Sequence, residues 1–420
     1  MSKQSRAERY EESAEEIGYG RDFRLYITGQ AVSLLGDRIA IIALTFLVIR
    51  LSRSFAPALG LFYICRVLPT LLGGLVAGVF VDHFSRKHLM VGCDLGRAAL
   101  LAVVPATSAL TLWTLYPLVI ALYALTLVFD TAARAALPDV VPENRMMAAN
   151  AVIQGFETSG DLAYVIGGAL IYILSLQAPF YIDAGTFVFS AALVSAMRLP
   201  GNPAGSLPSA RHVAERIREG TRYLLSNPFL KWSTIALAVA PVAGGAAFVL
   251  TPLYADHVLG QGVGITGPFH SGAFRFGVIQ GGEAIGALVG SVLAGWLARR
   301  WPRGVLFGCG IAGMGVADML LAFVTNIYTA TAILFVSGMF NSLFIISGVT
   351  LVQALTPSEM RGRVLAARST VLNTALALGS AIGGLLLLAL SYRALWLLEG
   401  AVIVAGSLFV WLRPEVRRQR

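Results

Sequence analysis

The chain has 420 residues, of which 56% are hydrophobic and 13% are charged, and its formal net charge is +9. Soluble globular domains carry about 25% charged residues, so the composition excludes an ordinary soluble domain and predicts a polytopic membrane protein. The Arg and Lys residues fall in short clusters between apolar runs, a pattern that orients membrane proteins, and no nucleic-acid partner is expected.

Residues 1–24 are polar, rich in Glu and without an apolar core. We interpret them as a cytoplasmic lead and not as a cleavable signal peptide. Twelve apolar runs follow, each long enough to cross about 30 Å of hydrocarbon, which takes roughly 20 residues. They lie near 25–51, 56–81, 89–110, 113–136, 147–173, 178–198, 232–256, 276–298, 304–324, 327–353, 363–389 and 392–412. The sequence thus predicts an all-α membrane protein with 12 transmembrane helices.

One long polar connection separates the first six runs from the second six. Within it, Val213, Ile217 and Leu224 recur at helical spacing opposite a basic face, which predicts an amphipathic helix on the cytoplasmic surface. The predicted units after the lead are an N-terminal six-helix half at 25–198, this linker at 199–231, a C-terminal six-helix half at 232–412 and a cytoplasmic tail at 413–420.

The basic residues are distributed unequally between the two sides of the membrane. With both termini in the cytoplasm, almost every Arg and Lys falls on the cytoplasmic side, and the opposite side keeps Arg50, Arg53, Arg275 and Arg393. Positive charge collects on the cytoplasmic side of membrane proteins. We therefore expect a multi-pass protein whose N- and C-termini are both cytoplasmic.

Three pairs of matching positions relate the two halves to each other. The pairs are Asp82 with Arg299, Pro142 with Pro357, and Gly167 with Gly383, at offsets of 217, 215 and 216 residues. Each pair lies at the same place in its half: after the second run, before the fifth run, and within the fifth run. The agreement of three separate offsets predicts two parallel six-helix repeats.

A charge cluster between the second and third runs forms a distinctive loop. Gly78 precedes it, and Asp82, Arg86 and Lys87 follow within ten residues. So short a cluster cannot lie in hydrocarbon, and it predicts a tight turn on one face of the bilayer. The spacing resembles the signature loop between helices 2 and 3 of the major facilitator superfamily, although four intervening positions differ from the usual residues. The resemblance implies two repeats that rock about a central cavity.

Four further stretches resemble one branch of this superfamily, which contains macrolide-efflux pumps, the enterobactin exporter and the lysophospholipid transporter. They are Gly29–Asp37, Asp94–Ala98, Leu137–Pro142 and Arg361–Val364. The resemblance implies a monomeric secondary transporter of the bacterial inner membrane, with protons and membrane lipids as partners. It would export an amphipathic drug or secondary metabolite by alternating access and proton antiport, as in multidrug resistance. A siderophore exporter and a lysophospholipid carrier are alternatives, and a non-transporting receptor or scaffold is the alternative of another class.

The sequence contains no motif for ATP hydrolysis or for metal catalysis. A Gly-x-x-x-x-Gly-Lys-Ser/Thr phosphate loop is absent, so we expect the energy to come from an ion gradient. The five histidines fall in loops or at the ends of runs, so no intramembrane metal site is expected. No cofactor and no catalytic residue are predicted.

Ionisable groups inside membrane spans are costly, so each is a candidate for function. We assign Asp37, Glu157, Asp161 and Glu283 as candidates for proton coupling. Glu157 and Asp161 lie four residues apart, on one face of a continuous helix. Two carboxylates so placed repel each other, which makes the pair a candidate proton carrier. The alternative is that these acids form structural ion pairs with neighbouring arginines.

Arg38, Arg66 and Asp318 are candidates to line the substrate cavity. Guanidinium groups bind carboxylates and phosphates in bidentate geometry, so an unpaired Arg66 would favour an anionic or zwitterionic substrate. Counting the three acids of the first and fifth runs against the two arginines predicts a roughly neutral cavity, which suits a weakly charged amphipathic molecule.

The resemblance also implies a cytoplasmic gate. In the superfamily the loop aspartate caps the start of the eleventh helix and the loop arginine pairs with an acid of the fourth, which corresponds here to Asp82 near Gly362 and to Arg86 with Asp130. The predicted gate comprises Gly78, Asp82, Arg86, Asp130, Arg134 and Gly362, and Asp94 and Arg97 are also placed toward cytoplasmic ends. The fifth run departs from the Gly-Pro-x-x-Gly-Gly pattern of antiporters, because Tyr164 replaces the proline, which weakens the case for strict proton antiport.

Overall fold

The protein was analysed as a computed structural model that describes residues 20–106, 110–199, 219, 221–226, 228–261 and 266–412. Regular structure within these ranges is entirely helical. Most of the predicted lead, the predicted tail, and Val213 and Ile217 of the predicted amphipathic helix lie outside the described residues.

The helices of the first repeat are α2 (Arg21–Ser52), α3 (Ala56–His83), α4 (Arg86–Ala106), α5 (Leu112–Val140), α6 (Met146–Gly160), α7 (Ala163–Ile173) and α8 (Ala178–Ala196), with the 3-10 turn η1 (Glu143–Arg145). Those of the second are α10 (Pro228–His257), α11 (Gly272–Leu297), α12 (Arg303–Leu321), α13 (Ile327–Leu355), α14 (Ser358–Leu386) and α15 (Tyr392–Trp411), with η2 (Leu259–Gln261) and η3 (Gly267–His270). We call α2–α8 the N-terminal bundle and α10–α15 the C-terminal bundle.

Eleven of the predicted spans coincide with single helices whose ends differ from the predicted ends by at most five residues. The fifth span instead forms two helices, α6 and α7. Ten stretches of the described helices are long and apolar enough to cross a membrane. The fifth and twelfth predicted spans are not among the ten, so the predicted all-helical membrane fold is confirmed, and the count of twelve stays a prediction.

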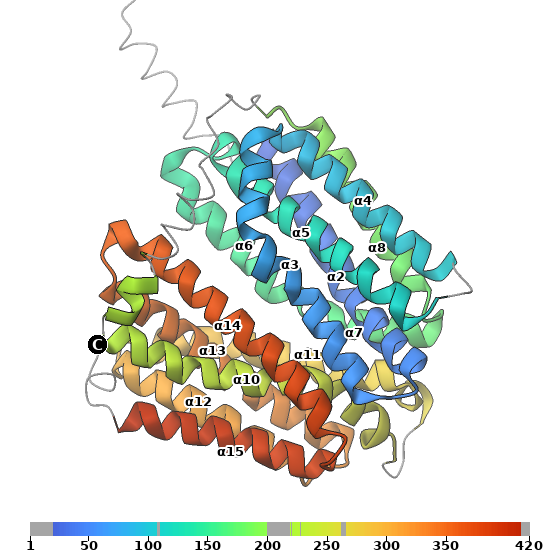
Figure 1. The fold of residues 1–420 in the computed structure, drawn as a ribbon, viewed down its shortest axis with the longest axis vertical. Helices are drawn as coiled ribbons and strands as arrows, with labels where there is room; N and C mark the ends of the chain where they lie inside the picture. The colour runs from blue at the N-terminus through green and yellow to red at the C-terminus, as the bar shows by residue number, and fades with distance from the viewer. Residues whose placement is uncertain are drawn as a thin grey trace, which may run out of the picture.

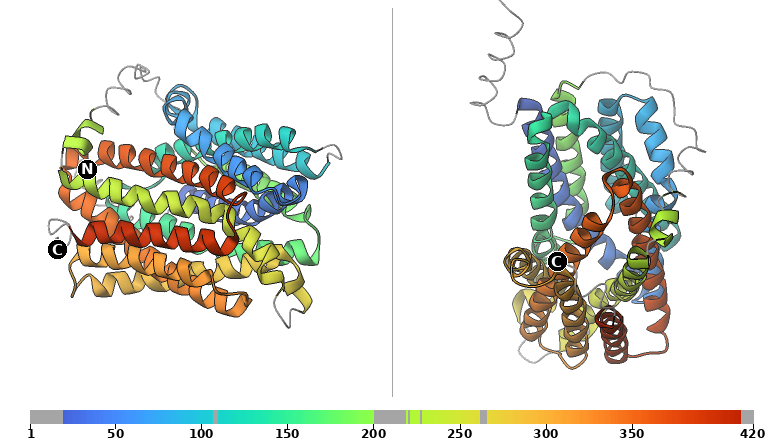
Figure 2. Two further views of the ribbon diagram at one scale, coloured as in Figure 1. Left: turned by 60° about the horizontal axis from the view of Figure 1, so that its bottom comes forward. Right: turned by 90° about the vertical axis from the view of Figure 1, so that its left-hand side faces the viewer.

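The two bundles lie side by side and repeat one arrangement (Figures 1 and 2). In the N-terminal bundle α3 packs on α5, α4 packs on α8, and α2 packs on α8. In the C-terminal bundle the helices at the same positions make the same pairs, which are α11 with α13, α12 with α15, and α10 with α15. This equivalence of neighbours is the structural counterpart of the repeat that the sequence predicts.

The bundles meet through α3 against α14 and through α7 against α11. Glycines allow the backbones to approach closely at these contacts. A Cβ built on Gly60 would lie 2.7 Å from the carbonyl oxygen of Ser380, and one on Gly168 would lie 2.6 Å from that of Ala273. Both contacts lie toward the end of the molecule where α2 finishes and α3 begins, and Figure 1 shows α3 and α14 converging toward that end.

Replacing Gly168 with Val should open this contact, because the added side chain would meet the backbone of α11. Overpacked sites cost roughly 1–3 kcal/mol, enough to shift the equilibrium between conformations. Spin labels at Arg53 and His270, exposed residues at this end of the two bundles, should show a longer distance in the variant by pulsed EPR. Gly185→Val is the matched control, since no atom lies within 4 Å of its Cβ position. Equal distances in the two variants would argue against the contact.

Candidate functional site

A cavity of about 500 Å³ lies in the N-terminal bundle. Six of the residues predicted from the sequence line it together: Asp37, Arg38, Arg66, Asp130, Arg134 and Glu157. Arg97 and Tyr123 contribute to the same wall. The structure therefore gathers charged groups of α2, α3, α4, α5 and α6 around one space, which the sequence did not show directly.

The helix α2 supplies the two adjacent charges, and they differ in their surroundings. The Nε of Arg38 lies 2.7 Å from Oδ1 of Asp161, and its guanidinium lies 5.8 Å from the ring centroid of Tyr164. Arg38 is thus held in a structural ion pair. Asp37 forms no ion pair or hydrogen bond with any residue in the described part of the chain, so its carboxylate is available to the cavity.

The fifth span breaks where Glu157 and Asp161 were expected to share a helix face. The helix α6 ends at Gly160, Asp161 is its C-cap, and α7 begins at Ala163. Backbone bonds of the tighter i to i−3 kind cross the break, including the amide of Leu162 to the carbonyl of Ser159 at 3.1 Å.

Of the two alternatives for these acids, the ion pair with Arg38 is the one that the structure shows for Asp161, and the two acids do not share one continuous helix. Glu157 lines the cavity, whereas Asp161 is neutralised by Arg38 at the break. The break forms without the missing proline, and next to it Gly160 lets Leu34 of α2 approach closely, because a Cβ there would lie 2.8 Å from a methyl carbon of Leu34.

Arg66 on α3 has a different kind of neighbour. Its guanidinium lies 5.3 Å from the ring centroid of Tyr123 on α5, a cation–π contact that leaves the charge in place. No carboxylate forms an ion pair with it within the described ranges. Of the two sequence-based alternatives, the structure thus favours an arginine that faces the cavity without a carboxylate partner.

Asp94 and Arg97 are buried in the middle of α4, not at its cytoplasmic end. The prediction was wrong because α4 begins at Arg86, earlier than the apolar run indicated. Arg97 donates a hydrogen bond to Asp94. The central carbon of its guanidinium group also lies 4.4 Å from the ring centroid of Phe129 and 4.0 Å from that of Phe187. Asp94 and Arg97 thus form a buried ion pair that packs α4 against α5 and α8 within the N-terminal bundle.

Asp183 on α8 is 1% exposed and accepts a hydrogen bond from Thr186 at 2.9 Å. The sequence reasoning missed this carboxyl group. Its signal was the one used for the other candidates, an ionisable residue within an apolar run, and here the run was 178–198.

The ion pair of Arg86 differs from the one expected for the predicted gate. Nη1 of Arg86 donates to Oδ2 of Asp139 at 2.7 Å, and not to Asp130, which lines the cavity. Nine residues of helix separate the two acids, about 13 Å along α5. Asp139 lies at the end of α5 that is level with the start of α4, and this decides the pairing. The side chains of the other predicted loop residues, Gly78, Asp82 and Gly362, lie outside the described part of the structure.

A double-mutant cycle should detect the pair between Arg86 and Asp139. Both side chains are partly exposed, so we expect a coupling free energy of about 0.5–1 kcal/mol in unfolding measurements. Arg86→Ala combined with Asp130→Asn is the matched comparison and should be additive. Coupling of Arg86 to Asp130 instead of to Asp139 would restore the original assignment.

A second cavity, of about 350 Å³, lies in the C-terminal bundle. It brings Glu283 of α11 together with Asp318 of α12, both predicted, and with Glu399 of α15, which the sequence reasoning missed. Glu399 also lies within an apolar run, so the rule for intramembrane charges would have found it. In the part of the chain that the structure describes, no three His, Cys, Asp or Glu side chains are grouped so that they could hold a metal ion.

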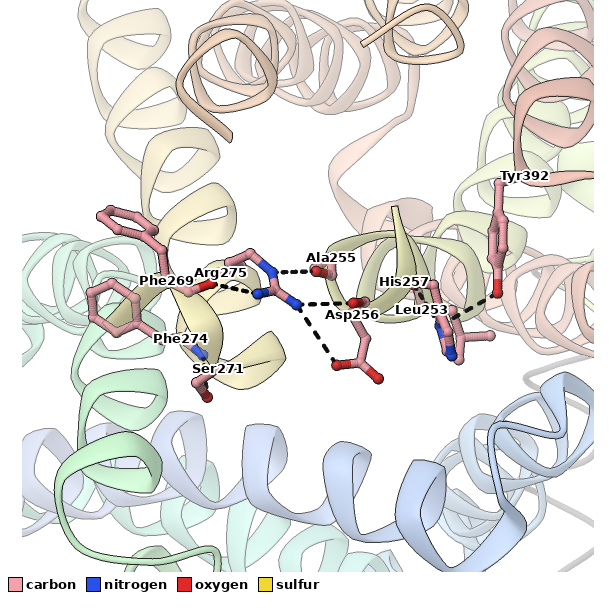
Figure 3. Close-up of polar contacts among 9 residues, drawn as sticks. All are labelled: Leu253, Ala255, Asp256, His257, Phe269, Ser271, Phe274, Arg275 and Tyr392. Carbon is pink, nitrogen blue, oxygen red and sulfur yellow. Dashed lines mark hydrogen bonds and ion pairs between the residues drawn. The ribbon is translucent and has the colours of Figure 1, made fainter. Parts of the chain in front are cut away.

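Arg275 joins the end of α10 to the start of α11, beside the contact between the bundles. Its Nε donates to the carbonyl of Ala255 at 2.6 Å and its Nη2 to that of Asp256 at 2.9 Å, while Nη1 donates to that of Phe269 (Figure 3). It is 3% exposed. The sequence placed Arg275 on the external side only by topology, and the structure shows that it caps free carbonyl groups there.

Comparisons with known proteins agree with this architecture. The Major Facilitator Superfamily matches residues 26–281 and 261–420. The multidrug efflux pump Tap of Mycobacterium tuberculosis is 26% identical over 409 residues, which cover 94% of this chain and 93% of that protein. Macrolide efflux protein A of Streptococcus pyogenes is 25% identical over 400 residues, covering 93% and 95%. The enterobactin exporter EntS of Citrobacter koseri is 26% identical over 358 residues, covering 83% and 82%.

The fold agrees as well. The crystal structure of the nucleoside transporter NupG superposes with a TM-score of 0.71 at 13% identity, covering 92% of this chain and 98% of that one. The family match confirms the predicted superfamily, and the named relatives confirm the resemblance to macrolide-efflux and enterobactin-export proteins. They indicate a membrane transporter and not an enzyme. The chain therefore belongs to the Major Facilitator Superfamily.

Proposed function

We propose that the protein is a secondary active transporter that exports an amphipathic small molecule by alternating access, driven by proton entry. The observation that carries this proposal is the cavity of the N-terminal bundle, in which Asp37 forms no ion pair or hydrogen bond within the described residues and lines the same space as Arg66 and Glu157. Such a carboxylate can take up and release a proton while the substrate occupies the same cavity.

The charges of this cavity fit a weakly charged substrate. Arg38 is paired with Asp161, and Arg97 with Asp94. The remaining charged lining residues are three acids and two arginines: Asp37, Asp130, Glu157, Arg66 and Arg134. Uptake of one proton would balance them, so proton binding and substrate charge would be linked.

The direction of transport is part of the same proposal. With both termini in the cytoplasm, the end at which the bundles meet faces outward, and the cavity opens toward the inside. Substrate would then enter from the cytoplasm or inner leaflet. The names of the relatives support export, because they are described as multidrug, macrolide and enterobactin efflux proteins.

A second candidate is the export of an anionic siderophore or the movement of a lysophospholipid. Arg66 favours it, because a guanidinium without a carboxylate partner binds carboxylate or phosphate groups in bidentate geometry. A receptor or scaffold without transport is the alternative of another class.

Transport in proteoliposomes with an imposed pH gradient tests these proposals. A panel should contain macrolides, amphipathic amines, a catecholate siderophore and a lysophospholipid. We expect uphill movement of an amphipathic drug only while the gradient is present. Movement of the siderophore or lipid alone would favour the second candidate, and ligand binding without movement of any compound would favour a receptor.

A further inference from the structure

The cavity of the C-terminal bundle differs in charge from the cavity described above. Three helices each contribute one carboxyl group to it, Glu283 from α11, Asp318 from α12 and Glu399 from α15. No Arg, Lys or His lines this space among the described residues. Its fixed charge is therefore of one sign, whereas the cavity of the N-terminal bundle contains both signs.

Glu399 is the least satisfied of the three acids. It is 4% exposed, neither of its carboxylate oxygens meets hydrogen-bond geometry with a described donor, and the backbone amide of Ala247 on α10 lies near enough to stabilise its charge. A buried carboxylate costs several kcal/mol unless a proton, a hydrogen-bond donor or a cation neutralises it. No Arg, Lys or His of the described residues lines this cavity, so the neutralising charge must come from a bound proton or from a cationic ligand.

Four aromatic side chains belong to the wall of this cavity, together with aliphatic and neutral polar residues. Phe248 of α10, Phe276 of α11, Phe344 of α13 and Trp396 of α15 line the same cavity. Aromatic faces attract cations, most strongly in desolvated sites, and quaternary ammonium groups are often bound in this way. Trp396 lies one turn before Glu399 on α15, so the ring and the carboxylate belong to one helix face.

The carboxylates are not grouped as metal ligands, which argues against a bare metal ion as the occupant. A volume of about 350 Å³ falls in the range of small-molecule pockets. An organic ammonium ion meets all of these conditions, because its positive charge neutralises the carboxylates and its apolar substituents pack on the aromatic rings.

We propose that this cavity is a separate site for the ammonium group of an amphipathic organic cation, with Glu399 as its principal counter-charge. The inference rests on the proposed function, because it names the chemical class that the transporter takes. The two cavities would then have different roles. The C-terminal bundle binds the cationic part of the substrate, and the N-terminal bundle binds the proton and, through its arginines, the polar groups of the substrate.

Equilibrium binding to the purified full chain in detergent tests the site. The probe is benzyltrimethylammonium, whose charge does not depend on pH, measured by isothermal titration calorimetry. We expect wild-type protein to bind it, and Glu399→Gln to lose about 10- to 100-fold in affinity. Asp318→Asn and Glu283→Gln provide second variants in case Glu399→Gln does not fold, and they should each weaken binding as well.

Two comparison variants make the result specific. Glu143→Gln removes an exposed carboxylate outside both cavities and should bind like wild type, and Glu157→Gln removes an acid of the other cavity and should also retain affinity. Absence of binding by wild type, or equal affinity in the folded acid variants of this cavity, would overturn the proposal. Loss of affinity in Glu157→Gln alone would overturn it too and would place the cation in the N-terminal bundle.

This experiment is independent of transport. Binding of the cation without uphill movement of any compound in proteoliposomes would keep the site and refute secondary transport. Proton-driven export of a compound by a protein that does not bind the cation would keep the proposed function and refute the site.

Discussion

Asp37→Asn should abolish proton-driven accumulation of substrate while downhill exchange continues. Asp37 lines the cavity of the N-terminal bundle and forms no ion pair or hydrogen bond within the described residues, although Arg97, Arg38 and Arg66 lie near enough to stabilise its charge. A proton bound to its carboxyl group would therefore exchange with the cavity. The amide keeps the shape of the side chain but cannot carry a proton. We expect at least a tenfold loss of uphill transport in proteoliposomes, with a smaller loss for Glu157→Gln, and little change in exchange without a gradient.

Two controls separate coupling from folding. Glu143→Gln, at an exposed position outside the cavities, should transport like wild type. Asp161 is paired with Arg38 at 2.7 Å. Asp161→Asn should therefore mainly lower thermal stability, whereas Asp37→Asn should mainly lower uphill transport. If Asp37→Asn and Glu157→Gln both concentrate substrate at the wild-type rate, the proton carrier lies elsewhere, and Glu283 is the next candidate.

Arg66→Ala should weaken the binding of a substrate that carries a carboxylate or phosphate by about 10- to 100-fold. A hydrogen bond to a charged group contributes about 1.5–3 kcal/mol, and Arg66 lines the cavity beside the ring of Tyr123 without an ion-paired carboxylate among the described residues. Arg66→Lys should recover part of the affinity, since it restores the charge without the bidentate fork. Binding to purified protein gives the affinities.

Arg38→Ala is the matched comparison for Arg66→Ala. Arg38 is held by Asp161 and Tyr164, so its removal should cost stability and change affinity less. Unchanged affinity in Arg66→Ala together with a loss of thermal stability would show that Arg66 is a structural partner of Tyr123. A substrate without an anionic group should be insensitive to either change, and this also distinguishes the siderophore and lipid alternatives from a neutral drug.

The helical spans of this protein could be predicted from the sequence because they depend on local properties. The length of an apolar run and the polar residues at its ends fix where a membrane helix begins and ends, and eleven spans match single helices closely. The fifth span was predicted less well. Its break at Gly160 and Asp161 lies where Leu34 and Arg38 of another helix contact the chain, and contacts between helices are not visible in a local pattern.

Many of the ionisable residues that line the cavities could also be predicted from the sequence. Ionisable residues in apolar runs were visible one by one, and six of those predicted line one cavity. Applying that rule to every run would have added Asp183 and Glu399. The family, with its two repeats, followed from loop residues whose spacing is fixed along the chain.

Which charges meet was decided only by the tertiary structure. The family resemblance implied that Arg86 pairs with Asp130, and the structure pairs it with Asp139 of the same helix α5 instead. Asp37 and Arg38 are neighbours in sequence and both line the cavity, yet only Arg38 forms an ion pair there among the described residues, with Asp161. Pairing across helices depends on their rotation and depth relative to one another, and a one-dimensional pattern of hydropathy and charge does not contain these quantities.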